Sequence, residues 1–117
     1  DGIELVRDPG SYCYTPDPAG RDAYRSACAH DVPRLPDREP ASLADGLFQL
    51  RGRTAARCLY FGLRGFIGEH RGFGAPVWRL VWLSDGELRV EDRSLAGPLD
   101  ARAVPPPFSP GYGLREA

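Results

Sequence analysis

The stretch from residue 77 to residue 93 decides the fold, and it reads Val77-Trp78-Arg79-Leu80-Val81-Trp82-Leu83-Ser84-Asp85-Gly86-Glu87-Leu88-Arg89-Val90-Glu91-Asp92-Arg93. Residues 77–84, before Asp85-Gly86, are rich in Val and Trp, and in residues 87–93, after it, Leu88 and Val90 alternate with charged residues. An Asp-Gly pair in this setting favours a two-residue type I′ turn, because both turn positions take positive φ angles. The sequence therefore predicts two antiparallel strands, 77–84 and 87–93, joined by a tight turn.

A two-residue turn also fixes the register of these strands, because side chains alternate between the two faces of a sheet. Ser84 is then opposite Glu87, and every later pair follows. The first face is predicted to be a core face with an ion pair at its margin, and it carries Val77, Val81, Leu83, Leu88 and Val90, with Arg79 opposite Asp92. The second face carries Trp78, Leu80 and Trp82, opposite Arg93, Glu91 and Arg89.

Outside the hairpin, the patterns predict short strands, one helix and several loops. Strands are expected over residues 2–6, 11–14, 47–51 and 57–63. Residues 65–74 contain four glycines in ten positions, which predicts a mobile or bulged loop. Asp17-Pro18 is typical of a helix start, and a short helix is expected over residues 19–30.

Prolines separate these elements and bound the domain. Those at 33, 36 and 40 predict an extended connector over residues 32–41, and those at 105–107 and 110 predict an irregular C-terminal tail over residues 103–117. The expected fold is mainly β with a minor α component: a small antiparallel sheet, sandwich or barrel with one short N-terminal helix. A chain of 117 residues is long enough for one such domain.

Composition argues against nucleic acid and membranes as partners. The formal net charge of −1 gives no field that attracts nucleic acid, and no apolar run reaches the ~20 residues of a transmembrane helix. The chain has no Lys, Asn or Met, and this bias toward Arg, Ala, Gly and Pro is typical of a GC-rich bacterial genome. Because it begins at Asp1, we expect that a signal peptide, a lipid-anchor segment or another upstream part has been removed.

The three cysteines leave two interpretations open. A disulfide between Cys13 and Cys28, which are 15 residues apart, would stabilise the fold by roughly 3 kcal/mol. The alternative is three free thiols, with Cys58 buried on a strand face beside Tyr60. A disulfide would place the chain in the periplasm or outside the cell, whereas free thiols fit the cytoplasm. Their spacing indicates no metal site, and no cofactor is predicted.

Two candidate binding sites contain aromatic and charged residues. The first is the glycine-framed segment 65–74, where Glu69, His70 and Arg71 are flanked by Phe66 and Phe73. The alternative is a loop with a purely structural role, whose phenylalanines fold onto the core while its charged side chains are solvated. The second is the face with Trp78, Trp82, Arg89 and Arg93, in which arginine stacked on tryptophan serves either structure or recognition.

These features favour a non-enzymatic domain that binds a protein partner, as inhibitor and immunity proteins do. No recognisable catalytic motif is present, so an enzyme is the less favoured alternative. It would be a small hydrolase or transferase using His70 with Glu69 or Asp31, or Cys28 with His30. A third hypothesis is a structural subunit of a larger assembly, which the proline-rich tail suggests.

Overall fold

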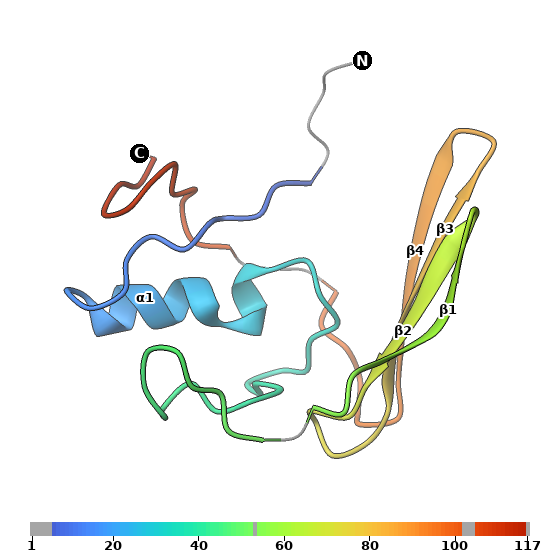
Figure 1. Cartoon of the computed structure of the whole chain (residues 1–117), viewed down its shortest axis with the longest axis horizontal. Coiled ribbons are helices and arrows are strands. Elements are labelled where there is room, and N and C mark those ends of the chain that lie inside the picture. Colours follow the sequence, from blue (N-terminus) through green and yellow to red (C-terminus); the bar gives the residue numbers. More distant parts are fainter. Residues whose placement is uncertain (1–5, 53, 102–104, 117) are drawn as a thin grey trace.

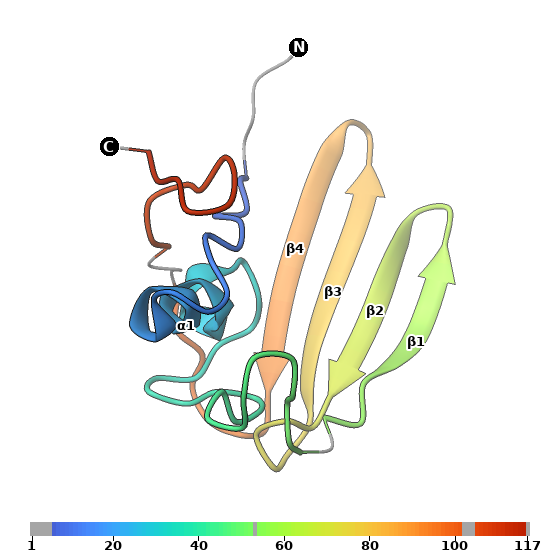
Figure 2. The ribbon, with the colours of Figure 1, turned by 60° about the vertical axis from the view of Figure 1, so that its left-hand side comes forward.

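The computed structural model describes residues 6–52, 54–101 and 105–116. Within these residues the chain is mainly β, with one four-stranded antiparallel sheet, one α-helix and one 3₁₀ helix. The strands follow one another across the sheet in chain order, as Figures 1 and 2 show. They are β1 (Arg57–Gly62), β2 (Gly65–His70), β3 (Val77–Ser84) and β4 (Glu87–Ser94).

The hairpin β3–β4 has the predicted turn and the predicted register. Asp85 and Gly86 have φ angles of 50° and 77°, the positive values that a type I′ turn requires. Ser84 pairs with Glu87, and the pairing continues without a slip to Val77 and Ser94. The two faces therefore carry the residues assigned to them from the sequence.

The expectation of a loop over residues 65–74 is wrong. Residues 65–70 form β2, which pairs with both β1 and β3, and only the end of the segment turns back toward β3. Gly68 has a packing role in this strand. A Cβ at Gly68 would lie 2.6 Å from the Phe66 ring, so the glycine makes room for that ring against the sheet.

The predicted helix is shorter than expected because Ser26 ends it. The α-helix α1 spans Pro18–Arg25, and Asp17 caps it by accepting a hydrogen bond from the Gly20 N–H at 2.9 Å. Ser26 has extended backbone angles and starts the 3₁₀ helix η1 (Ala27–Ala29), whose Cys28 N–H bonds to the Ser26 hydroxyl. One helix of twelve residues is thus replaced by two shorter pieces.

Helices and loops together form a second layer, which we call the loop layer: residues 6–52 and 105–116. The strands predicted at 11–14 and 47–51 are absent from it, although Arg51 pairs with Ser42 in an isolated β-bridge. Of the strand predicted at 2–6, residues 2–5 lie outside the described residues. The connector at 32–41 is irregular as expected, and so is the described part of the tail.

The two layers meet at one end of the sheet only (Figure 1). We call this end proximal, and the end with the turns at Leu63-Arg64 and Asp85-Gly86 distal. At the proximal end Val77 is fully buried against Leu35 and Phe73. We call the sheet face toward the loop layer the inner face and the opposite one the outer face; Val77 marks the inner face.

Candidate functional site

The distal half of the inner face carries apolar side chains that the loop layer does not cover. Strand pairing places Phe61, Phe66, Val81 and Val90 in one row across all four strands. A second row, nearer the turns, pairs Leu83 with Leu88. These six residues are called the inner patch, and it contains no charged side chain.

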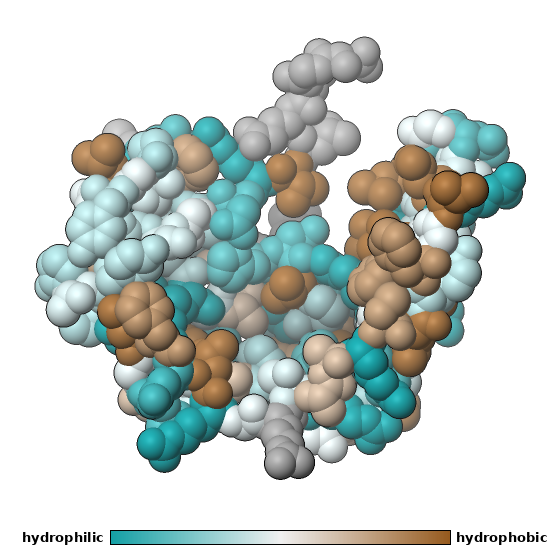
Figure 3. All heavy atoms as spheres, in the orientation of Figure 1, coloured by the Kyte–Doolittle hydropathy of each residue, from teal (hydrophilic) through white to brown (hydrophobic). Residues whose placement is uncertain are grey.

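Exposure within the inner patch rises toward the two edges of the sheet and toward the distal turns. Phe66 and Val81 are half-buried, whereas 82% of Phe61, 63% of Leu88, 55% of Leu83 and 45% of Val90 is exposed. Figure 3 shows apolar side chains gathered on this distal part of the sheet, across a gap from the loop layer. The sequence predicted a core face here, and at the distal end this prediction is wrong because nothing in the described chain packs over it.

An ion pair separates the inner patch from the buried core. Arg79 binds Asp92 through two parallel contacts of 2.8 Å, Nε to Oδ1 and Nη2 to Oδ2. Its guanidinium also donates to the Asp31 backbone carbonyl of the loop layer. The Asp92 carboxylate raises the pKa of Arg79 further above its usual value. The ion pair thus marks where the loop layer ends.

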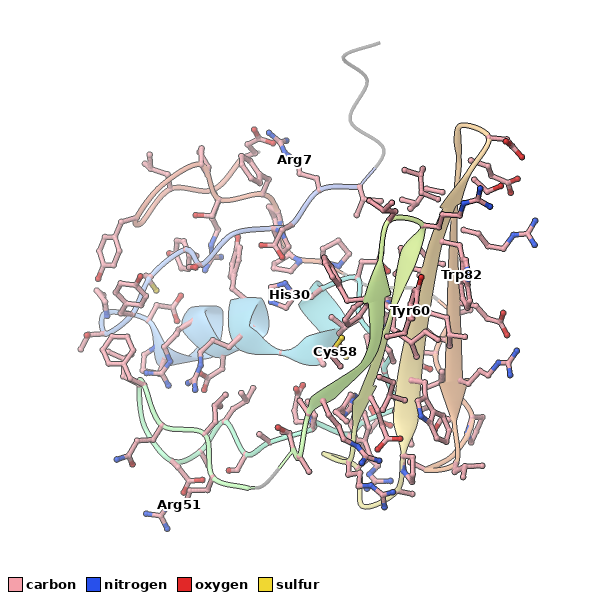
Figure 4. The ribbon with its side chains drawn as sticks, turned by 45° about the vertical axis from the view of Figure 1, so that its right-hand side comes forward. Arg7, His30, Arg51, Cys58, Tyr60 and Trp82 are labelled. Atoms are coloured by element: carbon pink, nitrogen blue, oxygen red, sulfur yellow. The ribbon has the colours of Figure 1, made fainter. Side chains whose placement is uncertain are left out.

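The outer face is apolar around Trp82 and charged along β4. Figure 4 shows Tyr60 and Trp82 on this side of the sheet and Cys58 on the other. Arg89 and Arg93 are opposite the tryptophans as predicted, but in the described chain neither stacks on a tryptophan ring. They pair instead along their own strand, and the shorter contact is the one from Arg93 Nε to Glu91 Oε1, at 2.7 Å.

Glu69 is a buried structural group of the outer face rather than the tip of a recognition loop. Its side chain is 5% exposed. Arg57 donates two hydrogen bonds to Oε1, and the Trp78 indole N–H donates to Oε2 at 2.8 Å. Arg71 lies 3.5 Å from Oε1. The hydrogen bonds from Arg57 are the main cause that lowers the pKa of Glu69.

His70 points to the opposite face and packs at the proximal end. Its ring lies 5.5 Å from the ring of Phe73, which is itself buried in the core. The Nδ1 atom accepts a hydrogen bond from the Gly72 N–H at 3.1 Å, which places the ring proton on Nε2. Burial lowers the pKa of His70, so the ring favours the neutral form. Phe73 and His70 thus stabilise the fold.

The structure does not bring together the pairs considered for catalysis. Glu69 and His70 are neighbours in a regular strand and lie on opposite faces. Asp31 is engaged by Arg79, and His30 by Asp8 at 2.6 Å and the Tyr24 carbonyl at 2.8 Å. No contact joins Cys28 to His30 among the described residues.

All three cysteines are free thiols, so the predicted Cys13–Cys28 disulfide is absent. Cys13 is buried at the start of α1, where its Sγ contacts the Asp17 carbonyl at 3.5 Å. Cys28 lies beyond the other end of that helix. Eight residues of α-helix are about 12 Å long, whereas bridged cysteines have Cα atoms within about 7 Å.

Cys58 is exposed, not buried, and it does not share a face with Tyr60. Cys58 pairs with Gly68 and Tyr60 with Ile67, so the extra residue Leu59 forms a bulge in β1. The bulge shifts the alternation of side chains by one. A bulge of this kind leaves no clear signal in the sequence.

Among the described residues, no group of three or more His, Cys, Asp or Glu side chains is arranged to hold a metal ion. In the same part of the chain, no helix is long and apolar enough to cross a bilayer.

No protein-family model matches this chain, and neither does a curated protein or a solved structure. The inner patch therefore has to be interpreted from its own geometry. Of its six residues, Phe66 alone was predicted from the sequence to be a binding residue. The hairpin register already placed Val81, Leu83, Leu88 and Val90 on one face, but the interpretation of residues 65–74 as a loop left out β2, which joins β1 to that face.

Proposed function

We propose that this chain is a protein-binding domain whose partner packs on the inner patch. One observation carries the proposal: the inner patch is a contiguous set of six apolar side chains on regular strands, and four of them are exposed because nothing in the described chain covers them. Contiguous exposed apolar surfaces of this kind are typical of protein interaction sites. An inhibitor or immunity protein is one form that such a function takes.

Three features support the inner patch over the sites suggested by the sequence. Glu69 and Phe73, taken as recognition residues, are buried and already engaged. Arg89 and Arg93 are balanced by glutamates on their own strand. The inner patch instead lies on regular strands with fixed register, so its shape is preformed, which lowers the entropy cost of binding.

The location outside the cytoplasm is not part of the proposal. It depended on a Cys13–Cys28 bridge, and the free thiols remove that support. The enzymatic alternative has no specific geometric support either, since none of the three candidate pairs is assembled.

Site-specific photo-crosslinking tests the proposal. A photoreactive phenylalanine analogue is placed at Phe61 in cells of the source organism, and separately at Phe48 as a matched control. Phe48 is 80% exposed against 82% for Phe61, but it belongs to the loop layer, where it packs at 5.7 Å on Tyr14. We expect a defined crosslinked product containing a second protein from position 61 and none from position 48.

Substitution provides the second half of the experiment. Leu88→Asp, introduced with the crosslinker at 61, places a charge within the apolar contact and should reduce the product at least tenfold. Equal yields from positions 48 and 61, or a yield that Leu88→Asp does not change, would overturn the placement of the site.

A further inference from the structure

The outer edge of β4 is an open edge with a regular backbone. In the described part of the chain, no segment pairs with this side of β4. The hairpin tip also stands apart from the loop layer in Figures 1 and 2. The other edge of the sheet, β1, is interrupted by the bulge at Leu59. Bulges blunt an edge against pairing, so β4 is the edge suited to it.

The backbone groups that face outward on β4 follow from the hairpin. In a two-residue turn the flanking pair, Ser84 and Glu87, exchanges both hydrogen bonds, and bonded and non-bonded pairs then alternate. The bond from the Leu95 N–H to the Pro76 carbonyl, 2.9 Å long, continues this series. Odd-numbered residues of β4 therefore bond to β3, whereas Leu88, Val90 and Asp92 direct their N–H and C=O groups toward solvent.

Charges alternate in sign along the outer face of the same strand. Glu87, Arg89, Glu91 and Arg93 occupy successive outer-face positions. An antiparallel strand of identical sequence, centred on Val90, would place Arg89 opposite Glu91 of the second copy and Glu87 opposite its Arg93. By two-fold symmetry, each of these pairs occurs twice. Opposite charges directly across an antiparallel pair are stabilising.

Neighbouring registers lack this complementarity. If the second strand slips by two residues, either Arg89 or Glu91 falls opposite its own copy, and the remaining charges also meet with like sign. Only the register centred on Val90 matches all four charges while it also aligns the outward-facing backbone groups. A slip by one residue would bring unlike faces of the two sheets together.

We propose that two copies of this chain associate through β4 in an antiparallel, two-fold arrangement centred on Val90, which makes one eight-stranded sheet. The row Phe61, Phe66, Val81 and Val90 then continues into the same row of the second copy. This deepens the proposed function, because the dimer brings the two inner patches into contact at Val90. Two-fold dimers are the commonest closed oligomers.

Charge reversal at the edge tests the proposal. Sedimentation equilibrium of the wild-type chain should show a concentration-dependent dimer. Arg89→Glu and Glu91→Arg should each weaken the dimer about tenfold or more, because each creates two like-charge pairs across the interface. The double variant R89E/E91R restores opposite charges in every pair and should bring the dimerisation constant back to within about threefold of wild type.

Arg64→Glu is the matched control, because it makes the same change of charge at an exposed position of the β1–β2 turn. It should leave the dimer unchanged. Circular dichroism checks that each variant folds. We expect that it does, because exposed ion pairs such as Arg89–Glu87 contribute little to stability. A chain that stays monomeric up to about 0.5 mM, or a double variant as weak as the single ones, would overturn the proposal.

Failure of the dimer is separable from failure of the proposed function. Crosslinking from position 61 to another protein in a chain that is monomeric by sedimentation would retain the inner patch as a binding site. That result would overturn only the proposed dimer. Conversely, dimerisation without any product from position 61 would leave the β4 edge as the interface and the inner patch without a partner.

Discussion

The two ends of the sheet are built from the same strands and have different surroundings. At the proximal end Val77 is fully buried, whereas Val90 and Leu88, on the same face, are about half exposed or more. The alternation of side chains determines which face a residue occupies. What covers that face depends on the size and position of the loop layer, and here that layer reaches only as far as Arg79.

Phe73 and Phe61 lie at opposite ends of the sheet and should differ most in how much their substitution lowers stability. Phe73→Ala should lower the free energy of unfolding by about 3–5 kcal/mol, because Phe73 is 4% exposed and packs on Leu35 and Val77. Phe61→Ala should change it by no more than about 0.5 kcal/mol, because its side chain is mostly in solvent. Urea denaturation of both variants measures the difference. Equal losses would mean that the distal end is covered.

The distal turn should have an intermediate effect. Gly86 has a φ of 77°, a conformation that costs an L-residue with a Cβ about 1–2 kcal/mol. Gly86→Ala should therefore lower the free energy of unfolding by roughly 1 kcal/mol, while Gly86→Asn, which tolerates positive φ, should cost less. Thermal unfolding of the two variants side by side checks this order. The reverse order would contradict the assignment of a type I′ turn.

The proximal end should also make stability depend on pH in two separate ranges. Burial lowers the pKa of folded His70 below its ordinary value of 6.5. Below about that pH the unfolded chain binds the proton more readily, so this residue's contribution is lost as pH falls. Hydrogen bonds lower the pKa of Glu69 from 4.5, and its contribution is present above that value and lost below it.

Two variants separate these ranges in unfolding curves recorded from pH 7.5 to pH 3. His70→Asn keeps an acceptor for the Gly72 N–H and should flatten the slope between pH 6.5 and 5. Glu69→Gln should flatten only the slope below about pH 4.5. An unchanged slope in His70→Asn would show that His70 is not buried as described.

A cysteine in the sheet and a cysteine in the loop layer should react at different rates with a thiol reagent. Cys58 is exposed and Cys13 buried, so in the native chain an aromatic disulfide reagent should modify Cys58 roughly tenfold faster than Cys13. In denaturant we expect three reactive thiols per chain. One thiol per denatured chain would instead reveal a bridge between Cys13 and Cys28.

Prediction from the sequence succeeded where a few adjacent residues are compatible with one local structure. Asp85-Gly86 admits one short turn, and that turn fixed eight cross-strand pairs. Asp17 was identified as a helix cap for the same reason, since an acceptor side chain followed by proline matches few other structures. Prediction failed at β2, where four glycines in ten residues concealed a strand that tertiary pairing stabilises.

The candidate site could be predicted only in part. Its composition was visible, because Val81, Leu83, Leu88 and Val90 were assigned to one apolar face. Its exposure was not, because coverage depends on where segments distant in the chain come to rest. The bulge at Leu59, which places Phe61 in the same row, follows from pairing with β2 and has no local sequence signal.

The bulge also limits how far the sheet can grow. Had both edges been as regular as β4, each added copy would have left a new open edge, and the chain could have polymerised into a fibril. Here β4 is regular and β1 is interrupted by the bulge. Once two copies pair through β4, the edges that remain exposed are the interrupted β1 edges. In the proposed dimer, association therefore ends at two copies, and the extra residue in β1 acts against open-ended assembly.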